Sequence, residues 1–271
     1  MTPPPAETND DAAERITGLV GDAIRRATER RLLAQIVREP VPKHLAIIMD
    51  GNRRFAEERG LNVREGHERG KDRLEELLNW CLEVGIRILT VYALSTENLN
   101  RPKSEVDSLM ELFERSFREI ATDERVHRHR IRVRAIGKRS VLPERVRAAI
   151  DVAEAATRDY DQYFYNVAIA YGGRDEIVEA IRSLAREVAS GRLAPEAIDA
   201  ATVSRHLYTA DLPDPDLVFR TSGEERISNF LLWQSAYSEL YFSDVLWPGL
   251  TELDFLRAIR AYQTRRRRFG A

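Results

Sequence analysis

The sequence contains very little cysteine. Cys81 is the only one, so no disulfide can form within the chain, and zinc sites built from several cysteines are excluded. Because Cys81 lies in an apolar stretch with helical spacing, we interpret it as a structural thiol and not as a nucleophile.

The chain also lacks long apolar runs and an excess of charge of either sign. No run approaches the roughly 20 residues that span a bilayer, and residues 1–11 have neither the basic nor the apolar region of a signal peptide. We therefore predict a cytoplasmic location, with a peripheral position at the membrane as the alternative. A formal net charge of −2 gives no overall attraction to nucleic acid, so no nucleic-acid partner is expected.

The first 40 residues differ from the rest of the chain. Residues 1 to about 10 predict a disordered start, and residues 11–37 carry an apolar stripe with helical period, which Pro40 and Pro42 end. This amphipathic helix has three possible sites of contact: the main domain, a partner subunit or a membrane surface. We divide the 271 residues into an N-terminal extension, 1–40, and one main domain, 41–271.

From Lys43 onward, short apolar runs alternate with amphipathic stretches. The apolar runs cover residues 45–49, 86–94, 131–136, 167–170, 217–219 and 240–242, and the stretches with helical period cover 68–84, 105–120, 143–160, 175–189 and 228–237. This alternation predicts an α/β fold, with a mainly parallel central sheet flanked by helices on both faces. Arg132 and Arg134 alternate with apolar residues in the third run, which predicts an edge strand with one face in water.

Polar residues follow several of these apolar runs. They are Asp50 to Arg54 after the first run, Ser95 to Asn98 and Arg101 after the second, and Arg220, Arg226 and Ser228 after the fifth. Because the carboxyl ends of parallel strands meet at one edge and bind ligands there, we expect these side chains to line one site. Arginine forks suit phosphate, and magnesium takes carboxylate and phosphate oxygens together. Asp50 and Glu239 are the natural metal ligands, so the pattern predicts a magnesium-assisted diphosphate enzyme.

Each of these motifs also has a simpler explanation. Asp50-Gly51 fits an ordinary strand-to-helix turn in which Asp50 caps the helix, and Glu239 fits an ordinary surface acid. The pattern along the whole edge of the sheet favours the diphosphate site over these separate explanations.

Several long motifs resemble those of the cis-prenyltransferases, the undecaprenyl diphosphate synthase family. They are HLAIIMDGNRRF at 44–55, REGH at 64–67, YALSTENLNRP at 92–102, AYGGR at 170–174, PDPDLVFRTSGE at 213–224, SNFLLWQ at 228–234, ELYF at 239–242, LWP at 246–248 and RRFG at 267–270. The resemblance therefore covers residue 41 or so to the C-terminus and implies that residues 41–271 are a catalytic cis-prenyltransferase domain. Arg53 and Phe55 stand where many bacterial members have glycine and tryptophan, and this version is more similar to archaeal and eukaryotic members.

The resemblance implies a role for each matched residue. Asp50 is the essential acid and holds magnesium, assisted by Glu239, while Ser95 and Asn98 position the condensing groups. The remaining substrate-binding residues are Gly51, Asn52, Arg53, Arg54, Phe55, Arg64, His67, Thr96, Glu97, Arg101, Arg220, Arg226 and Ser228. Arg268 and Gly270 match a C-terminal motif that reaches the site of a partner subunit, so the resemblance also implies a homodimer.

The implied reaction is the transfer of prenyl groups. Isopentenyl diphosphate condenses onto farnesyl or geranylgeranyl diphosphate with Mg²⁺ as cofactor, giving a long-chain cis-polyprenyl diphosphate, the precursor of a glycosyl carrier lipid. Release of this product implies transient association with a membrane surface. The alternative is a non-catalytic accessory subunit, which in this family lacks the catalytic acid. Trans-type prenyltransferases are disfavoured because their two aspartate-rich helical motifs have no counterpart here.

A growing prenyl chain needs an apolar tunnel. The helical stripe formed by Val106, Leu109, Met110, Phe113, Phe117 and Ile120, together with Leu74, Leu77, Leu78 and Cys81, fits either a tunnel wall or plain core, and the sequence leaves both open. The resemblance places Ala93 near the tunnel mouth.

Overall fold

The computed structural model describes residues 9–265, and contacts group them into two units. One unit contains α1 (Asn9–Ile36) and α9 (Glu252–Thr264), and the other extends from Pro42 to Leu250.

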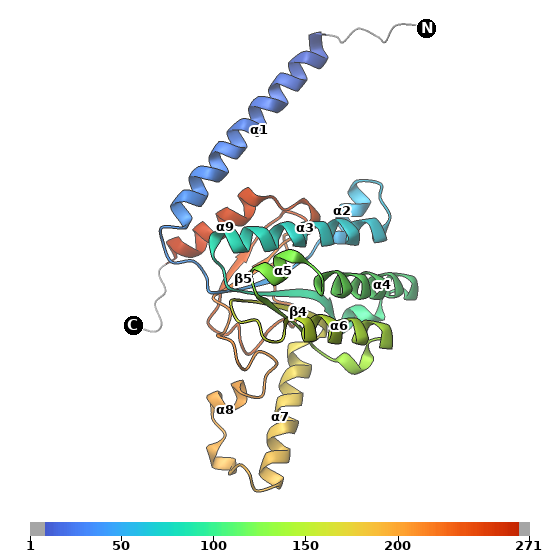
Figure 1. Ribbon diagram of the computed structural model, residues 1–271, viewed down its shortest axis with the longest axis vertical. Helices are drawn as coiled ribbons and strands as arrows, with labels where there is room; N and C mark the ends of the chain where they lie inside the picture. Colours follow the sequence, from blue (N-terminus) through green and yellow to red (C-terminus); the bar gives the residue numbers. More distant parts are fainter. Residues whose placement is uncertain (1–8, 266–271) are drawn as a thin grey trace. The chain divides into compact units, whose positions relative to one another are not determined.

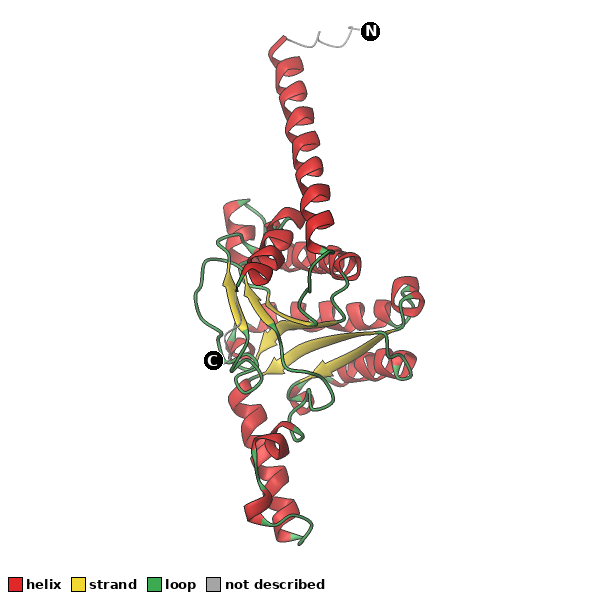
Figure 2. Ribbon diagram, turned by 90° about the vertical axis from the view of Figure 1, so that its left-hand side faces the viewer, coloured by secondary structure: helices red, strands yellow, loops and turns green. Residues whose placement is uncertain are grey.

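The larger unit is built around six strands. They are β1 (His44–Ile48), β2 (Ile88–Ser95), β3 (Ile131–Ile136), β4 (Tyr163–Tyr171), β5 (Leu217–Arg220) and β6 (Glu239–Phe242), and they form one sheet in the order β3-β4-β2-β1-β5-β6. Every pairing is parallel, as the apolar runs predicted. Figure 2 shows the strands in yellow with helices on both sides. The α/β architecture is confirmed, and β3 is an edge strand as its alternating arginines indicated.

Helices of this unit connect the strands. They are α2 (Asn52–Glu58), α3 (Val63–Val84), α4 (Lys103–Ile120), α5 (Glu124–Arg128), α6 (Glu144–Thr157), α7 (Gly173–Ala189) and α8 (Ala200–Ser204), with short 3-10 turns η1 (Glu97–Asn100), η2 (Arg139–Val141), η3 (Pro195–Ala197) and η4 (Trp247–Gly249). The predicted helix at 228–237 is absent, because Ser228, Asn229 and Leu231 adopt positive φ angles of 47°, 64° and 45°, which an α-helix does not allow. This segment forms turns.

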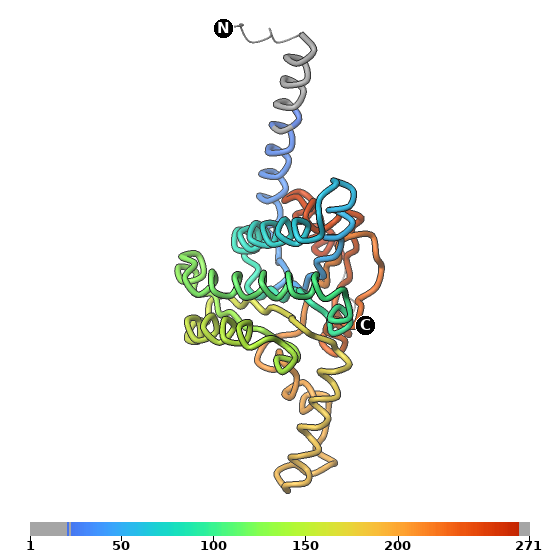
Figure 3. The backbone as a smooth tube through the Cα atoms, turned by 90° about the vertical axis from the view of Figure 1, so that its right-hand side faces the viewer, coloured from blue at the N-terminus to red at the C-terminus, as the bar shows by residue number. Residues whose placement is uncertain are grey.

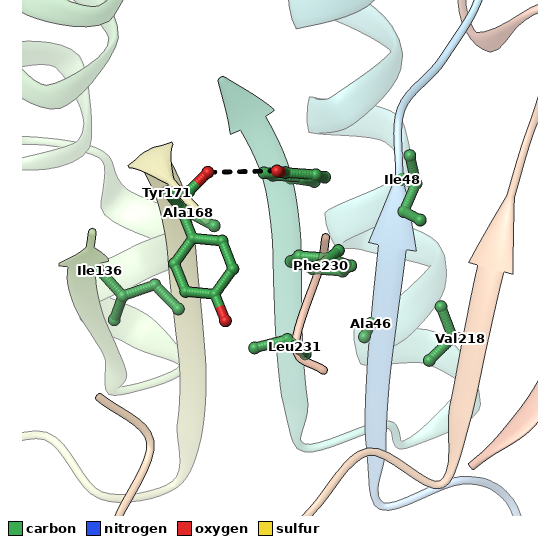
Figure 4. Packing of buried hydrophobic residues seen from close by; sticks show 9 residues of the cluster. Ala46, Ile48, Ile136, Ala168, Tyr171, Val218, Phe230 and Leu231 are labelled. Carbon is green, nitrogen blue, oxygen red and sulfur yellow. Dashed lines mark hydrogen bonds between the residues drawn. The ribbon is translucent and has the colours of Figure 1, made fainter. Parts of the chain in front are cut away.

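Successive side chains along each strand point to opposite faces of the sheet, and each face is covered by a different part of the chain. Ala46, Ile48 and Val218 point to the face on which Phe230 and Leu231 of the turn segment pack (Figure 4). The opposite face carries α3 and α4, which lie side by side in Figures 1 and 3. The turn segment therefore supplies core contacts on one face without being helical.

Two glycines let α3 approach the start of α2. A Cβ atom on Gly70 would lie 2.2 Å from Asn52 Oδ1, and one on Gly66 would lie 2.5 Å from Asn52 O. The contact at Gly66 is with a backbone oxygen, so glycine is required there, whereas a Cβ atom at Gly70 would displace the side-chain amide of Asn52. The close approach brings α3 to the edge of the sheet where β1 ends.

In the smaller unit, the end of α1 is tied to α9. Gln263 Nε2 donates to Ile36 O over 2.9 Å, and Arg260 Nη1 lies 3.1 Å from Glu39 Oε1. Upstream, Ile24 is 63% exposed. The predicted helix at 11–37 is present as Asn9–Ile36, so residues 9 and 10 of the start predicted to be disordered are helical, while residues 1–8 lie outside the described residues. Within the described part of the chain, no helix has the length and hydropathy of a membrane span.

Candidate active site

The carboxyl edge of the sheet carries a cleft of about 830 Å³. Among its lining residues are most of those that the sequence predicted, namely Asp50, Gly51, Asn52, Arg53, Arg54, His67, Ser95, Glu97, Asn98, Arg101, Arg220, Arg226 and Ser228. They follow β1, β2 and β5, whose carboxyl ends the parallel pairing brings together.

Asp50 and Arg220 form an ion pair in this cleft. Ile48 pairs with Arg220 in the sheet register, so Asp50 lies just beyond the end of β1 and within reach of the guanidinium. Arg220 Nη2 donates to Asp50 Oδ2 over 2.7 Å, and Arg220 is only 3% exposed. Burial alone would raise the pKa of Asp50, but the hydrogen bond and charge of Arg220, with Ser222 and the Gly51 amide, lower it below its ordinary value. Asp50 is therefore an ionised carboxylate near neutral pH.

Residues after β5 fix the backbone around Asp50. Thr221 Oγ1 donates to Asp50 O over 2.7 Å and accepts from Asp50 N over 3.0 Å. Ser222 Oγ accepts from Arg54 Nη2 over 2.7 Å. Thr221 and Ser222 were not predicted as site residues from the sequence. Their role depends on the pairing of β1 with β5, which no local pattern reveals.

The arginines of the cleft converge through shared acceptors. Arg220 Nη1 donates to Ser228 Oγ over 2.6 Å and to the carbonyl of Arg226 over 2.5 Å. Glu224 forms ion pairs with both Arg226 and Arg54, the latter at 3.5 Å. Three guanidinium groups are thereby held around one cleft, which suits more than one phosphate group.

Ser95 and Asn98 form a local turn at the end of β2. Asn98 N donates to Ser95 Oγ over 3.1 Å, and Ser95 N donates to Asn98 Oδ1 over 3.4 Å. Both residues line the cleft. Thr96 instead contacts Glu97 and Asp175, at 3.2 Å and 3.5 Å, and is not among the residues that line the cleft.

Glu105, in the first turn of α4, contacts three of the residues that line the cleft. Its Oε1 lies 3.1 Å from Arg101 Nη1, 3.4 Å from His67 Nε2 and 3.9 Å from Arg53 Nε, and its side chain is only 8% exposed. Burial lowers the pKa of His67 even though the hydrogen bond and charge of Glu105 act to raise it. Glu105 was not predicted from the sequence, because Arg101 precedes α4 and the two residues do not share a helix.

Replacing Glu105 with glutamine should weaken binding of a diphosphate in the cleft. The change removes the negative charge that pairs with Arg101 and Arg53, and hydrogen bonds to charged groups are worth enough to raise KM by about tenfold. Steady-state kinetics measures this, with Asp107→Asn as the control, because Asp107 lies on the same helix and pairs only with exposed Lys103 among the contacts described here. A KM that is unchanged or lower would contradict the positioning role.

Phe55 and Arg64 were also predicted for the site, but they are not among the residues that line the cleft. Phe55 is buried beneath Arg59, whose guanidinium carbon lies 3.9 Å from the ring centroid. Arg64 pairs with Glu111 at 3.6 Å and lines a separate neighbouring groove. Arg268 and Gly270 lie outside the described residues.

Glu239 is also separated from Asp50 within one chain. Glu239 begins β6 and pairs with Leu217, which pairs with Leu45, so it lies near the amino ends of the strands. Asp50 lies five residues beyond Leu45, roughly 16 Å along a strand direction at about 3.3 Å per residue. The expectation that Glu239 and Asp50 share a metal ion is therefore not met within the chain, because the register of β6 places Glu239 at the wrong edge.

An apolar chamber of about 90 Å³ adjoins the cleft. Met49, Asn52, His67, Ala93 and Leu109 line both spaces. Of the apolar residues singled out for a tunnel, the chamber is lined by Leu74, Leu109, Phe113, Phe117 and Ile120. Leu77, Cys81 and Met110 are buried core residues that do not line it, and burial raises the pKa of the Cys81 thiol. The stripe is thus partly chamber wall and partly core.

The donor set of the cleft fits a magnesium ion that is bound together with phosphate. Magnesium commonly uses one or two carboxylates and completes its shell with water and substrate phosphates. Asp50 supplies one ionised carboxylate surrounded by phosphate-binding cations. No group of three or more histidine, cysteine, aspartate or glutamate residues able to hold a metal occurs among the described residues. Asp50 would therefore hold the ion with help from the ligand.

A cleft of arginines around an ionised carboxylate, opening onto an apolar chamber, suits a ligand with a diphosphate head and a hydrocarbon tail. The fold and the cleft are thus those of an α/β enzyme for lipid-like diphosphates. A family model described as "Putative undecaprenyl diphosphate synthase" matches residues 48–270, so the chain belongs to the undecaprenyl diphosphate synthase family of cis-prenyltransferases. It is an enzyme that transfers prenyl groups.

Similar proteins and structures agree with this assignment. The chain is 57% identical to a tritrans,polycis-undecaprenyl-diphosphate synthase (geranylgeranyl-diphosphate specific) of Methanopyrus kandleri, over 89% of each chain. Its identity to the protein of the same description from Methanocaldococcus jannaschii is 54%, over 89% of this chain and 87% of that one. The crystal structure of lavandulyl diphosphate synthase from Lavandula x intermedia in complex with dimethylallyl diphosphate matches with a TM-score of 0.80 and 41% identity, over 85% of this chain and 99% of that chain.

Proposed function

We propose that this enzyme condenses isopentenyl diphosphate onto geranylgeranyl diphosphate and produces a long-chain cis-polyprenyl diphosphate. The observation that carries the proposal is the Asp50–Arg220 pair in a cleft of arginines that opens onto an apolar chamber. Geranylgeranyl diphosphate is preferred over farnesyl diphosphate as the starter because two relatives more than 50% identical are described as specific for it. Use of the product as a glycosyl carrier lipid stays a prediction.

The reaction exchanges one bond for another at the allylic carbon. The bond between that carbon and the diphosphate oxygen breaks, and the electron pair leaves with pyrophosphate. The double bond of isopentenyl diphosphate supplies the pair for the new carbon–carbon bond, and a proton is lost to form the new double bond. The protein must therefore bind two diphosphates side by side, orient the double bond and stabilise the charge on the leaving group.

The cleft provides groups for these tasks. Arg53, Arg54 and His67 lie on the side of the allylic diphosphate, while Arg220, Arg226 and Ser228 hold the diphosphate of isopentenyl diphosphate. Asp50 would hold a magnesium ion together with the substrate, and the ion would supply positive charge where the leaving group becomes more negative. Mg²⁺ is thus the proposed cofactor.

The departing diphosphate is the proposed proton acceptor. The carboxylate of Asp50 is made less basic by its hydrogen bond with Arg220. The amide of Asn98 is not a base, and Ser95 is already bonded to the backbone amide of Asn98. Asp50 and the Ser95–Asn98 pair therefore serve better as positioning groups than as bases.

The homodimer and the contact with membranes are parts of the same proposal. Tyr237 is 84% exposed and Leu240 is 36% exposed, and they lie at the edge strand β6. Apolar side chains exposed beside a sheet edge suit an interface between two copies of the chain. Trp247, by contrast, is 1% exposed and belongs to the core. The mass of the protein in solution at micromolar concentration tests the dimer, and a monomeric mass would contradict it.

Enlarging Ala93 to leucine should shorten the product. Ala93 lines both the cleft and the chamber, so the added atoms would narrow the passage between them. We expect products shorter by at least one isoprene unit, with a smaller effect on the first condensation. Chromatographic separation of the dephosphorylated products measures this, and an unchanged length distribution would place the growing chain elsewhere.

Competition between starters tests the proposed specificity. Equal concentrations of farnesyl and geranylgeranyl diphosphate, each carrying a different label, are incubated with isopentenyl diphosphate and magnesium. We expect the geranylgeranyl label to dominate the products. Dominance of the farnesyl label would overturn the starter, and lack of product from either starter would favour an accessory subunit that needs a partner chain.

A further inference from the structure

The chamber beside the cleft is too small for the product that the proposed function requires. Its volume is about 90 Å³, whereas a cavity of about 150 Å³ is known to take up one benzene molecule. An isoprene unit has nearly as many carbon atoms as benzene. The chamber is therefore too small for even one added unit as it stands, and growth of the chain requires its walls to separate.

Helices α3 and α4 form one wall of the chamber, and ion pairs on their outer side join the two helices. Lys71 Nζ of α3 lies 2.9 Å from Glu119 Oε2 of α4, and Arg115 Nη2 of α4 lies 2.5 Å from Glu68 Oε2 of α3. The two helices lie side by side in Figures 1 and 3. Lys71 also lines the chamber, so the pair that it forms lies directly over the space that must grow.

We propose that the two ion pairs Lys71–Glu119 and Glu68–Arg115, which we call the latch, limit how far α3 and α4 separate and thereby limit the length of the polyprenyl product. The inference rests on the proposed function and adds a control of chain length to it. Glu68, Arg115 and Glu119 have side chains 35%, 43% and 49% exposed, so the latch is accessible to water and ions. Exposed ion pairs are individually weak and are screened by salt, as suits a contact that must open during each round of growth.

The double variant Arg115→Gln/Glu119→Gln tests the latch directly. It removes both ion pairs, leaves the net charge unchanged and alters no residue that lines the chamber. We expect the main product to lengthen by one or more isoprene units. The wild-type product should also lengthen as salt rises from about 0.05 to 0.5 M, because screening weakens exposed pairs, whereas the variant should show a smaller response. The control Lys103→Gln/Asp107→Asn removes an exposed ion pair within α4 that does not reach α3, and it should keep the wild-type lengths and salt response.

A covalent bridge between α3 and α4 tests the opposite change, in which the two helices are prevented from separating. In a Glu68→Cys/Arg115→Cys variant, a short bifunctional thiol reagent with a cleavable centre would bridge the two helices, and the buried Cys81 would stay unmodified. We expect shorter products from the bridged protein and recovery after cleavage of the reagent, with thermal unfolding used to confirm that each variant is folded. Unchanged lengths in both the double variant and the bridged protein would overturn the latch alone. A wild-type protein that forms no prenyl product would overturn the proposed function and the latch together.

Discussion

Asp50→Asn should abolish condensation while leaving the fold intact. Asparagine keeps the size of the side chain but removes the charge that pairs with Arg220 and that would hold magnesium. Loss of one group that stabilises developing charge commonly lowers kcat by about 10²–10³-fold, and Asp50 also organises an arginine, so we expect at least a thousandfold loss. Pyrophosphate release in the presence of both substrates and magnesium measures the effect.

Binding measurements separate this loss from a failure to fold. Asp50→Asn should still bind pyrophosphate in the presence of a chelator, because Arg54, Arg220 and Arg226 remain, but added magnesium should strengthen binding much less than in the wild-type protein. A variant with more than about a tenth of wild-type turnover would contradict the role of Asp50. Thermal unfolding monitored by circular dichroism serves as the control for the fold.

Arg220→Met should lower both stability and activity, with a pH dependence that identifies the Asp50 pair. The change leaves the half-buried Asp50 carboxylate without its guanidinium donor, and we expect a loss of roughly 1–2 kcal/mol in the free energy of unfolding, with solvent screening included. Binding of isopentenyl diphosphate should weaken by at least tenfold, because Arg220 also orders Ser228 and the carbonyl of Arg226.

The direction of the pH effect follows from the pKa of Asp50. Arg220 holds this pKa below its ordinary value of 3.8, so the stabilisation by the ion pair is complete above about pH 4 and is lost as pH falls through the lowered pKa. In Arg220→Met, burial raises the pKa of Asp50, so the difference in unfolding free energy from the wild-type protein should be constant only above this raised pKa and should shrink as pH falls through both pKa values. Denaturant titrations across this range measure it. A difference that persists at pH 2 would mean that Arg220 stabilises the fold through other contacts.

The sheet was predictable because its apolar runs are nearly continuous. Residues 45–49, 86–94 and 217–219 were assigned within one or two residues of β1, β2 and β5, since strands buried on both faces allow few polar residues. The segment 228–237 was not predictable from periodicity. Its apolar residues have helical spacing, but the backbone turns through left-handed conformations to place Phe230 and Leu231 in the core.

The cleft was predictable to the extent that it follows strand ends. Asp50 and Arg220 were assigned to one site because both follow strands that turned out to be neighbours. Glu105 was missed because its role depends on how α4 packs against the cleft. Glu239 was assigned to the wrong edge of the sheet. It is the first residue of the short strand β6, whereas the site lies where the strands end, and the sequence does not show which end of such a short strand faces the site. The packing of Phe55 beneath Arg59 was likewise invisible to motif spacing.

The central claim is that this protein elongates an allylic diphosphate in the cleft around Asp50. The most direct test incubates the purified full-length chain with labelled isopentenyl diphosphate, geranylgeranyl diphosphate and magnesium, and resolves the lipid products by length. We predict a series of products that differ by one isoprene unit, that disappears with a chelator and that is absent in Asp50→Asn. Incorporation that continues in Asp50→Asn, or no incorporation by a folded wild-type protein, would contradict the account.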